Sequence, residues 1–227
     1  MFRARTVMLA VLLTTAAARA SPYWIEYEPA GGHFPEEEGW YRFTGYGGDQ
    51  RAIEDGWLVM DGLADPRIYD YALTGTDGGL DPGAGELFIA QWKLRVDEAG
   101  YYYDPGVGIF SDEKWAVGFV LNETTIYSAF ETDVSASFEP GVPHTFAFQS
   151  SDMRAYVLSI DGTPAINGSF WLSLTGPAIA WGDMVQGGFS LARWDYFRFG
   201  VVPEGNSLVM GGSIVTLLPL CRARTRR

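Results

Sequence analysis

The chain has 227 residues, of which 28 are acidic and 16 are basic, and it contains one cysteine, Cys221. The segment 21–200 holds 27 of the acidic residues and 9 of the basic ones, so its formal charge is near −18. This charge opposes binding to nucleic acid or anionic lipid, and a single cysteine excludes an intramolecular disulfide, so apolar burial must stabilise the fold.

The N-terminal residues have the three parts of a secretory signal peptide. Two arginines lie near the start, residues 7–13 are apolar, and Ala18 and Ala20 provide small residues before Ser21. A core helix would need a polar face, which residues 7–13 lack. We therefore expect residues 1–20 to be a signal peptide that is removed on export, so that the mature chain begins near Ser21.

The body of the chain has the pattern of an all-β protein. Between residues 40 and 200, short aromatic and β-branched runs are separated by Gly, Pro, Asp and Asn, without a long run of helical period. This predicts an antiparallel sandwich or barrel, as one domain over residues 21–200, with few helices. The expected strands are 40–46, 56–61, 67–72, 86–96, 106–111, 114–121, 124–130, 144–150, 153–160, 164–170, 178–182 and 189–199.

Local patterns predict which strand faces are buried and where the chain turns. Apolar residues at 115, 117, 119 and 121 fall on one face of a strand, so this face is expected to pack inward. The pair Asp161-Gly162 suits the positive φ of a tight hairpin. Residues 75–85 are rich in Gly and Asp and are expected to form a loop with little to bury.

Aromatic residues make up 15% of the chain, and eight of them are tryptophans. We expect the tryptophans at 57, 92, 115, 171 and 194 to fill the sandwich. Tyr101, Tyr102 and Tyr103 are consecutive, so they cannot all face a core if the segment is extended. Because sugars stack on aromatic rings and polar groups fix their hydroxyls, these tyrosines and Asp104 form the candidate ligand-binding cluster.

The candidate metal ligands are Asp77, Asp81 and Asp183 in Gly-containing loops, together with Asp195 on the closing strand. Calcium takes six to eight oxygen ligands from carboxylates and loop carbonyls, so it is the metal that this composition favours. Asp at a turn usually serves the turn itself, so we expect no cofactor, with calcium as the open alternative. Two histidines and one cysteine are too few for a zinc cluster.

Catalytic patterns are absent from the sequence. Glycoside hydrolysis needs two carboxyl groups across the sugar, about 5–10 Å apart, and alternate residues of one strand are a common source of them. Glu36–Glu38 are consecutive and are expected in a solvated loop, whereas Asp97-Glu98 are adjacent and are expected in a turn. His33 and His144 lack a triad pattern, so we expect no catalytic residue and no enzymatic activity.

The composition changes after Gly200. The motif Val202-Pro203-Glu204-Gly205 is followed by an apolar run over 207–220, which is short for a full membrane span. A basic end follows, and it is expected to stay on the cytoplasmic side of the membrane. Its arginines are Arg222, Arg224, Arg226 and Arg227.

In its three-part order, this tail resembles the PEP-CTERM sorting signal of exosortase-processed bacterial proteins, with Gly205 in place of the second proline. The resemblance implies that Val202, Pro203 and Glu204 form a sorting motif. It also implies an exosortase-type processing enzyme as a partner and an association of residues 201–227 with the inner membrane, which is transient if the tail is processed and permanent if Gly205 in the motif prevents processing.

Segments 156–162, 181–183 and 192–199 resemble the back half of concanavalin A-like, laminin G-like jelly rolls, where an Asp-Gly hairpin, a Gly-Asp loop and a closing aromatic strand follow one another. The expected function is that of an exported, non-catalytic envelope or matrix protein that binds extracellular polysaccharide or another envelope component. Two alternatives are open: a structural matrix protein without a ligand, and a glycoside hydrolase or polysaccharide lyase with dispersed catalytic residues.

Overall fold

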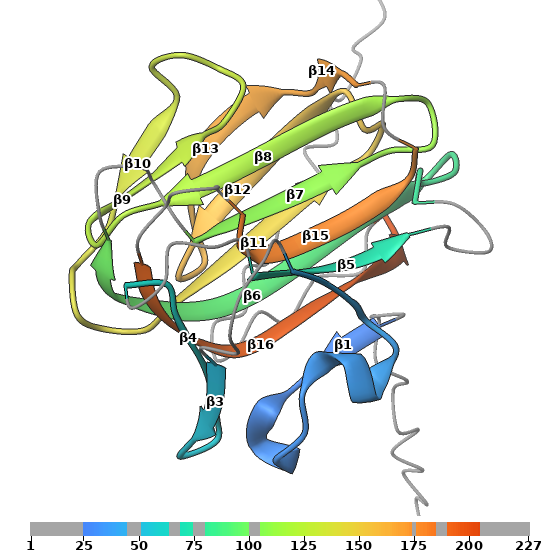
Figure 1. Cartoon of the computed structure of the whole chain (residues 1–227). Helices are drawn as coiled ribbons and strands as arrows, with labels where there is room; N and C mark the ends of the chain where they lie inside the picture. Colours follow the sequence, from blue (N-terminus) through green and yellow to red (C-terminus); the bar gives the residue numbers. More distant parts are fainter. Residues whose placement is uncertain are drawn as a thin grey trace, which may run out of the picture.

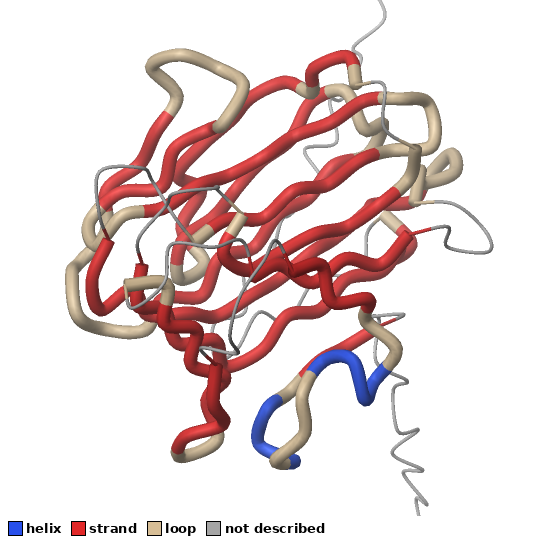
Figure 2. The backbone as a smooth tube through the Cα atoms, in the orientation of Figure 1, coloured by secondary structure: helices blue, strands red, loops and turns tan. Residues whose placement is uncertain are grey.

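The computed structural model describes residues 25–44, 51–63, 69–74, 80–99, 105–173, 176–184 and 190–204, with the backbone alone at 43–44 and 69–74. Over these ranges, two antiparallel β-sheets pack face to face (Figure 1), and the only helices are two short 3-10 turns, η1 (Pro29–Gly31) and η2 (Pro35–Glu38), drawn in blue in Figure 2. The predicted jelly-roll sandwich is confirmed. No helix in the described ranges is long and apolar enough to cross a membrane.

One layer, sheet A, is built around two 14-residue strands that lie side by side, β6 and β16. In order across the sheet, its strands are β13 (Thr163–Ser169), β12 (Ala155–Ile160), β11 (His144–Ser150), β6 (Glu86–Ala99), β16 (Ser190–Pro203), β4 (Trp57–Asp61) and β3 (Arg51–Glu54). The short strand β1 (Ile25–Tyr27) also pairs with β16, through Phe197 and Phe199.

The other layer, sheet B, has β8, β7 and β15 at its centre (Figure 1). Its strands in order are β10 (Ser135–Ser137), β9 (Thr125–Ser128), β8 (Trp115–Leu121), β7 (Gly106–Phe110), β15 (Ala178–Asp183), β5 (Tyr69–Thr74) and β2 (Tyr41–Thr44). A two-residue strand, β14 (Trp171–Leu172), pairs with the first residues of β8.

The core lies between the layers and is largely aromatic. On β8, Val117, Phe119 and Leu121 are fully buried, which confirms the alternation predicted for this strand. Trp92 of β6 stacks between two phenylalanine rings of its own sheet, those of Phe146 and Phe197, at centroid distances of 5.7 and 6.1 Å. A core of this kind can hold the sandwich without a disulfide, because each buried aromatic side chain removes a large apolar area from water.

The hairpin between β12 and β13 forms where the sequence predicts it. Asp161 and Gly162 both have positive φ, 50° and 80°, as a tight two-residue turn requires. The Asp161 carboxylate also accepts hydrogen bonds from the Thr145 backbone N–H (2.9 Å) and lies 2.6 Å from Nδ1 of His144. The turn is therefore fixed to β11 as well as to its own strands.

The tryptophan prediction is correct for part of the set and wrong for Trp171. Trp92 and Trp194 are fully buried, and Trp115 is partly buried against the core. Trp57 instead lies on the outer face of sheet A, where the Lys93 ammonium is 5.4 Å from its ring. Trp171 is 53% exposed, because Phe170 beside it takes the core position and alternation turns Trp171 outward.

Two predicted turns differ in the structure. Asp97-Glu98 continue strand β6, because Asp97 on the outer face is paired with the side chains of Arg95 and Arg193. Those two arginines hold the pKa of Asp97 below its ordinary value, although burial alone would raise it. In the loop predicted over 75–85, the described part contains a fully buried leucine, Leu80, so this loop has more to bury than its composition indicates.

Strand β16 runs past the predicted end of the domain at residue 200. Val202 pairs with Leu87 and is buried, and Pro203 pairs with Glu86. The backbone N–H of Glu204 then bonds to the Gly85 carbonyl at 2.7 Å. Val202, which we expected in a sorting motif, is therefore part of the sandwich.

Candidate functional site

The outer face of sheet B has a floor of glycine and alanine. Gly118, Gly108, Ala180 and Ala72 oppose one another across the neighbouring strands β8, β7, β15 and β5. The neighbours of Gly118, Gly108 and Ala180 along their strands are core residues, so alternation places these three residues on the opposite, outer face. These positions add at most methyl groups to the face, and Gly108, Gly118 and Ala180 are themselves buried.

Three side chains cover the two glycines of this floor and leave little room for a larger residue there. A Cβ atom added at Gly108 would lie 3.0 Å from the Phe110 ring and 3.2 Å from the Met184 methyl. A Cβ atom at Gly118 would lie 3.3 Å from the Phe130 ring. Larger residues in the floor would displace these groups, so the floor and its covering side chains form one unit.

Exposed aromatic rings lie around the floor. Trp171 pairs with Ala116 of β8, so both side chains project from the same outer face. Tyr41 on the edge strand β2 is 65% exposed, Phe130 is 42% exposed, and Trp171 itself is 53% exposed. Large apolar side chains that gather on one face of a small protein mark an interaction site.

Trp171 is held in place by its surroundings. The preceding residue, Phe170, is buried, and its backbone N–H bonds to the Arg154 carbonyl at 2.8 Å. On the other side, Trp171 and Leu172 pair with Ala116 and Trp115 of β8. The short strand that presents Trp171 is thus fixed on both sides before any ligand binds.

The predicted tyrosine cluster, Tyr101, Tyr102 and Tyr103 with Asp104, lies outside the described residues, as does Asp77. In sequence, the cluster immediately precedes Pro105 and β7, the strand that provides Gly106 and Gly108 of the floor. Sequence reasoning did not identify Trp171 or Tyr41. A signal for Trp171 was present, because it follows Phe170 directly and two adjacent residues of a strand cannot both face the core.

The described candidate calcium ligands are separate from one another. Asp81 belongs to a turn in which it and Asp112 each accept a hydrogen bond from the other's backbone N–H, at 3.0 and 3.1 Å. Asp195 is 2.6 Å from the Lys93 ammonium, so a cation is already beside it. Asp183 is buried at the end of β15. In the part of the chain that the structure describes, no three His, Cys, Asp or Glu side chains are grouped as metal ligands.

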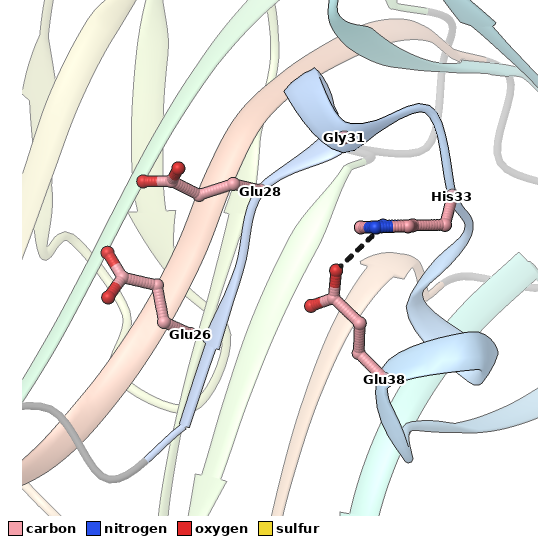
Figure 3. A pocket seen from close by; sticks show the side chains of 5 residues that line it. All are labelled: Glu26, Glu28, Gly31, His33 and Glu38. Carbon is pink, nitrogen blue, oxygen red and sulfur yellow. Dashed lines mark ion pairs between the residues drawn. The ribbon is translucent and has the colours of Figure 1, made fainter.

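A hollow of about 380 Å³ lies beside β1 and is lined by Glu26, Glu28, Gly31, His33 and Glu38 (Figure 3). His33 pairs with Glu38 at 3.0 Å, and Glu26 is bound by Arg198 at 2.7 Å. Burial and the nearby Glu28 raise the pKa of Glu38. Glu26 and Glu28 point away from the His33–Glu38 pair, so the four side chains do not converge on one ligand (Figure 3).

His144 is a structural residue of the sandwich. It begins β11 as predicted, and it is 7% exposed. Its Nδ1 lies 2.6 Å from Asp161 and its Nε2 lies 2.8 Å from the Glu139 carbonyl, while its ring packs on Phe138. Both ring nitrogens are occupied by these contacts.

No protein-family model and no curated protein matches the sequence. Among solved structures, the conserved carbohydrate esterase vb_24B_21 from Shiga toxin-encoding bacteriophage phi24B is similar, with a TM-score of 0.56 and 11% identity over 80% of this chain and 98% of that chain. An endo-1,3-beta-glucanase from Streptomyces sioyaensis is also similar, with a TM-score of 0.51 and 13% identity over 72% of this chain and 89% of that chain. The likeness places the chain in the jelly-roll sandwich class of folds.

Proposed function

We propose that this chain is an exported bacterial envelope or extracellular-matrix protein that binds carbohydrate, without catalysis, on the outer face of sheet B. The observation that carries the proposal is the exposed ring of Trp171 beside a floor of glycine and alanine. The exposed ring is accessible to a sugar chain at the surface, and aromatic rings stack on the apolar faces of pyranoses. The phage carbohydrate esterase and the Streptomyces endo-1,3-beta-glucanase are both named for action on carbohydrates, which agrees with this ligand class.

The outer positions of β8 support a non-catalytic role. These positions are occupied by Ala116, Gly118 and Val120, which have no titratable group. A glycosidase on this face would need two carboxyl groups directed at the sugar. Among the strand residues of this face whose side chains the structure describes, none is charged.

Replacing Trp171 by alanine is expected to weaken polysaccharide binding about tenfold or more, because a stacked tryptophan is the kind of residue that dominates a binding site. The matched control is Trp57→Ala, which removes a tryptophan from the outer face of the opposite sheet. Calorimetry or affinity gels against a panel of polysaccharides give the measurement. Equal binding by wild type and Trp171→Ala, while both stay folded, would move the site elsewhere.

We further propose that residues 1–20 direct export and that the tail beyond Glu204 holds the chain at the inner membrane for an exosortase-type enzyme. Exported protein should begin near Ser21, and processing should occur beyond Glu204, because the backbone up to Glu204 is bonded into the sandwich. Mass spectrometry of both mature ends tests this. Met1 on exported protein would contradict the signal peptide, and Arg227 on protein from the medium would contradict the sorting tail.

A further inference from the structure

We infer that the polysaccharide bound on the outer face of sheet B is uncharged rather than acidic; the inference rests on the carbohydrate-binding function proposed above. Recognition of uronic acids or sulfated sugars requires cations that are free to pair with the ligand. The position and the pairing of the cations in this chain are therefore informative about the ligand.

Most of the described cationic side chains lie on sheet A, whereas an acidic ligand on sheet B would need cations on sheet B. Lys93, Arg193 and Arg198 alternate with core residues of β6 and β16, so they project from the outer face of sheet A. Each is also occupied, because Lys93 pairs with Asp195 at 2.6 Å, Arg193 with Asp97 at 2.8 Å, and Arg198 with Glu26 at 2.7 Å. These cations are therefore engaged in ion pairs within the fold, and they are not available to bind an acidic ligand.

Two cations, Lys114 and Arg154, lie near Trp171, and carboxylates offset both. Arg154 is paired with Glu113 at 2.5 Å and lies on the Trp115 ring. Lys114 is exposed in the turn before β8, and in the sequence it follows the acidic pair Asp112-Glu113. The local charge near the exposed tryptophan is therefore close to balanced.

The net negative charge of the whole domain also favours an uncharged ligand over an acidic one. Segment 21–200 carries a formal charge near −18. A polyanion would meet this repulsion at every approach, and the repulsion is strong at low salt, where screening is weak. An uncharged polysaccharide approaches without this cost, and its rings still find the aromatic partners described above.

Native affinity electrophoresis of the full chain provides the test. The gels contain a neutral polymer, such as a β-1,3-glucan, a mixed-linkage β-glucan, a xylan or a mannan, or an acidic one, namely alginate or polygalacturonate. We expect at least one neutral polymer to retard the chain equally at low and high salt, and Trp171→Ala to remove the retardation. The variant Glu113→Gln, which takes away a carboxylate beside the site, should change neutral binding by no more than about twofold.

The outcomes separate this inference from the proposed function. Retardation by alginate or polygalacturonate that Trp171→Ala abolishes and high salt weakens would keep the binding site and overturn its neutral specificity. A marked gain in affinity for an acidic polymer in Glu113→Gln, from a measurable wild-type level, would overturn it in the same way. Absence of retardation by every polymer would overturn the carbohydrate function itself, and this inference with it.

Discussion

Replacement of Trp181 by alanine is expected to lower the free energy of unfolding by about 3–5 kcal/mol, a large part of the total stability of about 5–15 kcal/mol that a domain of this kind has. Trp181 on β15 is fully buried between the sheets. Its ring stacks on Phe197 of β16, with centroids 5.3 Å apart and planes 5° apart, and it contacts Trp194 at 4.9 Å. It therefore joins sheet B to the central strand of sheet A.

The same ring also holds the N-terminal segment of the chain. Tyr27 of β1 and Trp40 before β2 contact Trp181 at centroid distances of 5.5 and 5.7 Å. Truncation to alanine would leave a cavity bordered by four rings from three separate segments, which can collapse only in part. We expect a lower denaturant midpoint, together with a weaker near-ultraviolet circular dichroism signal from the remaining rings.

Trp171→Ala is the matched control for this experiment, because it deletes the same side chain from an exposed position. We expect it to cost about 1 kcal/mol or less. Because both variants replace tryptophan by alanine, the difference between their free energies of unfolding reports the difference in burial of the two side chains. If guanidinium unfolding gave Trp181→Ala and Trp171→Ala the same midpoint, the aromatic core between the sheets would be misassigned.

The regular strands could be predicted because their sequences alternate and their turns contain Gly, Asp or Pro. Strand β11 agrees with its predicted bounds, 144–150, and the Asp161-Gly162 hairpin forms as expected. Short strands such as β1 and β14 were missed, since two or three residues are too few to display a period of two. Their strand geometry depends on pairing with β16 and β8, which are distant in sequence.

The sequence interpretation was also wrong where a strand contains charged residues. Asp97-Glu98 had the composition of a turn, yet β6 continues through them, because Arg193 of the neighbouring strand β16 pairs with Asp97 at 2.8 Å. That partner is remote in sequence, and the register that brings the two together follows from the tertiary fold. A prediction from residue propensity alone therefore placed the end of this strand too early.

The candidate site was the least predictable part. Tyrosine clusters and tryptophans stand out in a sequence, whereas a floor of glycine and alanine is visible only once the strands are in register. Gly108 and Gly118 come from different strands and become neighbours through the pairing of β7 with β8. Trp171 acquires its position beside Ala116 in the same way, through β14. The residue types could be recognised in the sequence, but their arrangement on the outer face of sheet B could not.

A chain that ends at Gly200 is expected to be less stable than one that ends at Glu204 by about 2–3 kcal/mol, with a melting temperature lower by roughly 4–12 °C. Of the four additional residues, Val201 to Pro203 complete β16. Val202 is 4% exposed, and the strand stays paired with β6 as far as Pro203 opposite Glu86. Removing them exposes the apolar surface that Val202 covers and leaves the end of β6 without its neighbour.

The control is the comparison of the Glu204-ended chain with the full mature chain. Because the backbone N–H of Glu204 makes the last described bond to the sandwich, at 2.7 Å to the Gly85 carbonyl, residues beyond it should add little to the melting temperature of the domain. Calorimetry of the three chains measures both differences. Equal melting of the Gly200-ended and Glu204-ended chains would mean that Val202 contributes nothing to the core, and the domain would then end at residue 200, leaving Val202 to Glu204 free to act only as a sorting motif.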